Sequence, residues 1–133
     1  MSPIIQPDTT EAVDLSPIEP NTYLAEVMKV DFQTSSKGGA MIVPSFDVTV
    51  ESGKKPRSRK TFLNISGPGS SGFDQLLRAC HLDALADQFK DPAVQPKPQF
   101  DTDTLIGQKV QVVIVEDMYQ NQKRDKITSF LKA

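Results

Sequence analysis

The sequence predicts an all-β fold with one helix, and three observations lead to that prediction. Five short segments have the patterns of strands: the first three alternate apolar and polar residues with a two-residue period, and the fourth is a valine-rich apolar run. Turns containing glycine or proline separate most of the five segments. One segment between the third and fourth strands has helical spacing instead. The length of 133 residues suits one domain, and a hydrophobic content of 38% is too high for wholesale disorder.

The first two predicted strands follow a proline-containing segment. Residues 1–19 show no apolar period, so we expect an acidic, flexible arm there and a single domain over residues 20–133. The apolar alternation that begins at Tyr23 changes parity between Val27 and Met28, which predicts a strand with a central bulge. After the loop "QTSSKGGA", the second strand alternates from Ile42 onward, with one apolar face and one mostly polar face.

A basic run separates the second strand from the third. It contains five cations and no acidic residue, although the formal net charge of the whole chain is -2. Gly53 and Pro56 favour a hairpin loop over this run, and "KTFLNIS" then predicts the third strand. The five cations are Lys54, Lys55, Arg57, Arg59 and Lys60.

The predicted helix follows "GPGSSG". Its apolar residues Phe73, Leu76, Leu77 and Cys80 have the spacing of one helical stripe. A short second helical turn and a proline-rich connector come next. The segment "KVQVVIVED" predicts a buried strand, "MYQNQKRDK" a polar loop, and "KITSFLKA" the fifth strand.

This order of elements is that of the OB fold, a partly open, five-stranded Greek-key barrel with a helix between strands three and four. Its ligands contact strands two and three and the loops that join strands one to two and four to five. In such a barrel the cationic segments would form one track along the open face, suited to a phosphate backbone. Leu63 and Ile65 occupy the core face of the third strand, so Phe62 would point to the ligand side, where unpaired bases stack on aromatic rings. The candidate nucleic-acid-binding residues are Lys37, Lys54, Lys55, Arg57, Arg59, Lys60, Phe62, Tyr119, Lys123, Arg124 and Lys126.

Each of these features also has a purely structural explanation. A basic hairpin is commonly a solvated turn, and Phe62 could pack under the arm or under the proline-rich connector. Tyr119 could cover a loop with its hydroxyl in water. The coincidence of all three features on the elements that this fold uses for ligands favours the binding interpretation.

The sequence gives little support to an enzyme or to a metal or cofactor site. His81 is the only histidine, and its neighbour Cys80 belongs to the apolar stripe, so the two side chains diverge on a helix. Neither zinc-ligand spacing nor a Walker loop is present. With no apolar run of about 20 residues and no signal peptide, we expect a cytoplasmic protein without a membrane segment.

The ordering and spacing resemble those of phage-encoded single-stranded DNA-binding proteins, in particular an uncharacterised family found near replication and recombination genes. The resembling segments are "TYLAEVMKVDF", "PSFDVTV", "KTFLNIS", "FDQLLRACHL" and "LIGQKVQVVIVEDMYQNQKRDKITSFL". The resemblance implies a protein that coats single-stranded DNA without strong sequence preference, in the host cytoplasm, alongside phage replication or recombination proteins. Many members of this functional class end in an acidic tail that recruits partners, whereas this chain ends "SFLKA".

The sequence is also compatible with a function of a different class. An OB-like barrel could serve as a protein-interaction module in a phage assembly, with its basic loop against an acidic partner. A homopolymeric oligonucleotide should bind the first kind of protein and largely ignore the second. The sequence leaves the choice between DNA and RNA and the oligomeric state undecided.

Overall fold

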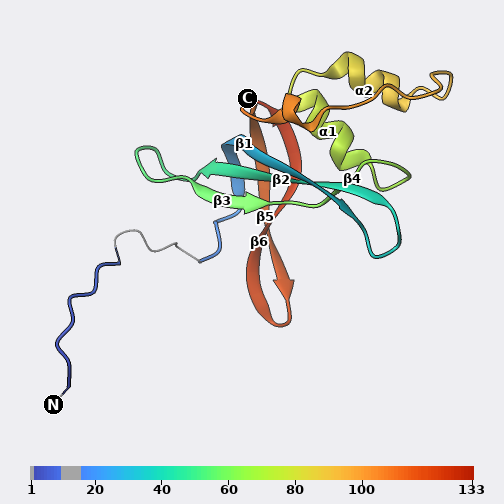
Figure 1. Cartoon of the computed structure of the whole chain (residues 1–133). Coiled ribbons are helices and arrows are strands. Elements are labelled where there is room, and N and C mark those ends of the chain that lie inside the picture. Colours follow the sequence, from blue (N-terminus) through green and yellow to red (C-terminus); the bar gives the residue numbers. More distant parts are fainter. Residues whose placement is uncertain (1, 10–15) are drawn as a thin grey trace.

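The computed structural model describes residues 2–9 and 16–133, which form an antiparallel sheet with two helices at one side (Figure 1). The strands are β1 (Asn21–Thr34), β2 (Ala40–Thr49), β3 (Arg57–Lys60), β4 (Leu63–Asn64), β5 (Lys109–Tyr119) and β6 (Gln122–Lys132). The helices are α1 (Ser71–Ala79) and α2 (Asp83–Lys90), and a 3₁₀ turn covers Thr102–Leu105.

The strand order in the sheet is β3-β2-β1-β5-β6, with β4 paired to the other end of β2. The prediction of a mostly β fold is confirmed, but the predicted five-stranded barrel with one helix is wrong in three respects. The sheet has six strands and is not closed, because the described part of the chain has no β3–β6 pairing. The predicted third strand is interrupted at Thr61 and Phe62, which divides it into β3 and β4. The short turn after α1 is a second helix, whose Ala86 packs into the core.

The predicted bulge in the first strand is confirmed. The register between β1 and β2 shifts between Val27 and Lys29, which places Met28 in the bulge. Val27 lies opposite Phe46 on the core face, whereas Lys29 lies opposite Ser45 on the outer face. Strict alternation from Val27 would place residue 28 on the outer face and residue 29 on the core face. The bulge instead moves residue 29 to the outer face.

The core lies between the inner face of the sheet and α1. Phe46 of β2 stacks on Phe130 of β6 with ring centroids 5.6 Å apart, and the stripe of α1 from Phe73 to Cys80 is buried as predicted. Each fully buried large apolar side chain stabilises such a core by roughly 1.5–3 kcal/mol. Ile18 is also in the core, at 3% exposure, so the packed part of the chain begins before Pro20. Of the predicted arm, residues 1 and 10–15 lie outside the described residues.

Two segments that were predicted as polar loops are strands. Arg57 to Lys60 pair with β2, so the loop before them ends at Pro56. Most of "MYQNQKRDK" belongs to β5 and β6, which extend away from the rest of the sheet as a hairpin (Figure 1). Its turn is only Gln120 and Asn121, both with positive φ, the conformation that two-residue hairpin turns require. Polar side chains on both faces of these strands removed the apolar alternation by which strands are recognised in a sequence.

Candidate nucleic-acid interface

Three of the five cations of the basic run lie in β3, and they point to both faces of the sheet. Arg57 and Arg59 lie opposite Val48 and Phe46, two residues that face the core, whereas Lys60 lies on the outer face. The two remaining cations, Lys54 and Lys55, lie in the exposed turn before β3. Because neighbouring residues of a strand point to opposite faces, the run does not form a single charged surface.

Arg59 and Arg57 bind groups of the protein itself. Arg59 donates two hydrogen bonds to the carboxylate of Asp125 on β6, from Nε at 2.8 Å and from Nη2 at 2.9 Å. The backbone N–H of Ile18 donates to the same carboxylate at 2.8 Å. The carbonyl oxygen of Ser16 accepts hydrogen bonds from both arginines. These contacts connect the two edge strands, β3 and β6, to each other and to residues 16–18.

The environment of Asp125 keeps its carboxylate charged. Its side chain is only 8% exposed, and this burial by itself would raise the pKa. The hydrogen bonds from Arg59 and from the Ile18 N–H, with the positive charges of Arg59 and Arg57, outweigh the burial and hold the pKa of Asp125 below its ordinary value. The ion pair is therefore part of the folded structure, and both arginines have hydrogen-bond partners within the chain itself.

The outer face of the sheet carries an exposed aromatic ring beside a cation. Phe62 lies between β3 and β4 with 54% of its surface exposed, while the neighbouring Leu63 is buried. Lys60 Nζ lies 5.7 Å from the centroid of the Phe62 ring. Lys60 is opposite Ser45, and Ser45 is opposite Lys29 of β1. We call Phe62, Lys60, Ser45 and Lys29 the outer-face patch.

Lys29 is a member of this patch that the sequence analysis missed. Its Nζ lies 3.5 Å from the carboxylate of Asp31, and its side chain is 67% exposed. The parity change at the predicted bulge was the signal that could have found it, because that change places Lys29 opposite a residue of the polar face of β2.

The β5–β6 hairpin carries a second exposed aromatic ring beside a cation. The guanidinium carbon of Arg124 lies 4.4 Å from the ring centroid of Tyr119, which is 53% exposed. Arg124 also pairs with Asp117 at 3.3 Å, and Lys123 pairs with Glu116 at 3.8 Å. Such exposed ion pairs contribute little to stability, so the cations remain able to exchange their partners for phosphates. We call Tyr119, Arg124 and the exposed Lys126 the hairpin patch.

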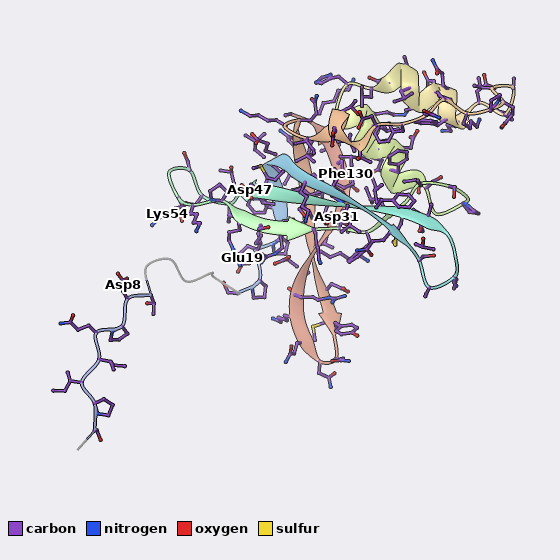
Figure 2. All side chains as sticks on the ribbon, in the orientation of Figure 1. Asp8, Glu19, Asp31, Asp47, Lys54 and Phe130 are labelled. Carbon is purple, nitrogen blue, oxygen red and sulfur yellow. The ribbon has the colours of Figure 1, made fainter. Side chains whose placement is uncertain are left out.

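The cations of the two turns that flank β2 lie too far apart to form the predicted single track. Lys37 lies in the turn before β2, and Lys54 and Lys55 lie in the turn after it. These turns are at opposite ends of a ten-residue strand, a separation of about 30 Å at 3.3 Å per residue. Figures 1 and 2 show the two turns at opposite ends of β2, with Lys54 labelled on the turn that leads into β3.

No protein-family model and no curated protein matches this sequence. Within residues 2–9 and 16–133, no group of three or more histidine, cysteine, aspartate or glutamate side chains could hold a metal ion. Over the same residues, no helix has the length and apolar character needed to cross a membrane. Cys80 is buried as predicted, which raises the pKa of its thiol to about 11, and His81 is exposed as predicted.

Proposed function

We propose that this protein binds single-stranded DNA without strong sequence preference, with the outer-face patch as its main contact. The observation that supports this proposal is the exposed ring of Phe62 with Lys60 beside it. Every base has a π-face, and stacking one base on such a ring contributes about 1–3 kcal/mol whatever the sequence. Lys29 and Lys60, on either side of Ser45, would contact successive phosphates.

The hairpin patch would be the second contact. Tyr119 offers another ring, and Arg124 and Lys126 offer cations on a ribbon that extends from the sheet. Lys54 and Lys55 would attract the strand electrostatically from their exposed turn. Stacking requires an unpaired base, which is why we propose a single strand in preference to a duplex. The setting, phage replication or recombination in the host cytoplasm, comes from the sequence resemblance alone.

The test is a titration of fluorescently labelled oligo-dT, followed by anisotropy. A matched control is an abasic sugar-phosphate strand of equal length, which has the same charge but offers no base to stack. We expect oligo-dT to bind more tightly than the abasic strand and more tightly than duplex DNA. Equal affinities for oligo-dT and the abasic strand would contradict the stacking role, and no binding at all would favour the protein-interaction alternative. An oligo-U strand in the same assay decides between DNA and RNA.

A further inference from the structure

An apolar groove of about 770 Å³ opens between the sheet and the helices. Phe32 of β1 lines it and is 64% exposed. On the helical side the groove is lined by Phe73, Phe89 and Phe100, whose ring centroids lie 5.5 to 6.2 Å from one another. The three rings form one aromatic cluster, and Phe32 of the sheet lines the same groove. None of its lining residues belongs to the outer-face patch or to the hairpin patch.

The charges around the groove favour an acidic occupant. Lys90 and Lys97 line it on the helical side. Asp74 is the acidic lining residue, and it is already paired with Arg78 at 3.1 Å. A segment that combines apolar side chains with carboxylates would therefore match both the aromatic cluster and the charge of the groove.

The N-terminal arm has this combination. Ile4 is 98% exposed and Ile5 is 73% exposed, an adjacent apolar pair with almost no cover. Pro3 and Pro7 flank the pair, and proline favours the extended conformation in which short segments enter aromatic-lined grooves. The first 26 residues contain five acidic residues and neither lysine nor arginine, and the acidic residues are Asp8, Glu11, Asp14, Glu19 and Glu26.

We infer that Ile4 and Ile5 of one molecule occupy this groove in a second copy of the chain. Within one chain, Ile4, Ile5 and Phe32 all remain exposed, so a single molecule leaves both surfaces uncovered. The arm is fixed to its own body at Ser16, through Arg57 and Arg59, and Figure 1 shows that segment entering the body far from α1 and α2. The chain from Ile4 to Ser16 can span at most about 40 Å, enough to reach a neighbouring molecule. Reciprocal exchange of two arms would close a symmetric dimer.

Sedimentation equilibrium of the full chain over a wide concentration range, without DNA, tests the inference. We expect a reversible dimer that the double variant Ile4→Ser, Ile5→Ser converts to a monomer. Phe32→Glu should do the same, because it removes an exposed groove residue and repels the acidic arm. Phe62→Glu is the matched control, since it changes another ring that is more than half exposed but lies outside the groove, and it should leave the dimer intact. A full chain that is monomeric at every concentration, or a dimer that survives Phe32→Glu, would overturn the inference.

Mixing the two monomeric variants makes the test specific for exchange. The arm variant keeps an intact groove and Phe32→Glu keeps an intact arm, so one arm-in-groove contact remains possible between them. We expect a mixture of the two to form a heterodimer that neither forms alone, and a labelled peptide of residues 2–9 to bind the arm variant saturably. Absence of both the heterodimer and the peptide complex would contradict the inference. These readouts require no DNA, so their failure is distinguishable from failure of the proposed function.

Discussion

Arg59 of β3 and Asp125 of β6 join the two edge strands of the open sheet through a two-point ion pair. In the absence of backbone pairing between those strands, this contact and the Ile18 N–H bond to Asp125 hold the edge together. Part of the basic run therefore has a structural role. Variants of Arg59 should change folding first and binding only as a consequence.

Replacing Asp125 with asparagine should lower the free energy of unfolding by about 1–3 kcal/mol. The loss should be smaller than for a fully buried pair because the side chain of Arg59 is still 23% exposed. Urea denaturation measures the change. Asp117→Asn is the matched control, because its pair with Arg124 is more exposed and should contribute under about 1 kcal/mol. Equal losses for the two variants would contradict the role of Asp125.

The ion pair should also make stability depend on pH. Because the folded-state pKa of Asp125 is depressed, the stability that it contributes is present above the ordinary carboxyl pKa and is lost as pH falls through the folded-state pKa. The difference in unfolding free energy between wild type and Asp125→Asn should therefore be constant from neutral pH to about pH 4 and shrink below it. Denaturation series at several pH values measure it. A difference that grows on acidification would show that another group is responsible.

Phe62→Ala should weaken oligo-dT binding by about 1–3 kcal/mol and leave the thermal melting temperature near that of the wild type. The ring is more than half exposed, so its removal creates no core cavity. Phe62→Tyr retains a ring and should bind almost as tightly as wild type. Anisotropy titrations at one salt concentration and a thermal melt separate binding from stability. A large fall in melting temperature for Phe62→Ala would instead make this residue a packing element.

Removing the two turn lysines should flatten the salt dependence of DNA binding. For single strands the slope of log K against log salt falls by about 0.7 for each phosphate contact that is lost, so Lys54→Ala with Lys55→Ala should reduce it by up to about 1.4. Titrations of oligo-dT at several salt concentrations give the slope. Lys132→Ala removes an exposed lysine of β6 that pairs with Asp83 of α2, and it should leave the slope unchanged. An unaltered slope in the double variant would remove this turn from the interface.

Much of the fold could be predicted because its signals are local. Alternation from Pro44 to Val48 and the parity change at Met28 follow directly from which side chains are buried, and the structure confirms both. Val43, which the alternation places on the mostly polar face, is buried as well. Whether the sheet closes into a barrel cannot be predicted from any single segment, because closure depends on whether a four-residue β3 can pair with a polar β6. Nothing in either segment alone indicates that side chains, rather than backbone bonds, hold the two edges together.

The candidate site was predictable to the same limited extent. Leu63 was expected to face the core, and its neighbour in a strand points to the opposite face, so Phe62 was expected to be exposed. The structure confirms that it is. The partner of Arg59 lies 66 positions away, so the sequence around the basic run could not reveal that this cation is already bound. The sequence shows the cations of the hairpin, but it could not show that Arg124 and Lys123 each pair with a carboxylate on the neighbouring strand.

The bulge at Met28 divides β1 into parts with different numbers of neighbours, and this difference determines how its amides should exchange with deuterated water. Residues 24–26 pair with β2 on one side and β5 on the other, whereas residues 29–34 pair with β2 alone. Backbone N–H groups of a strand alternate in direction, so those of the doubly paired stretch should all exchange slowly. Beyond Met28, every second amide lacks a strand partner and should exchange fast, giving a period-two pattern that starts at the bulge.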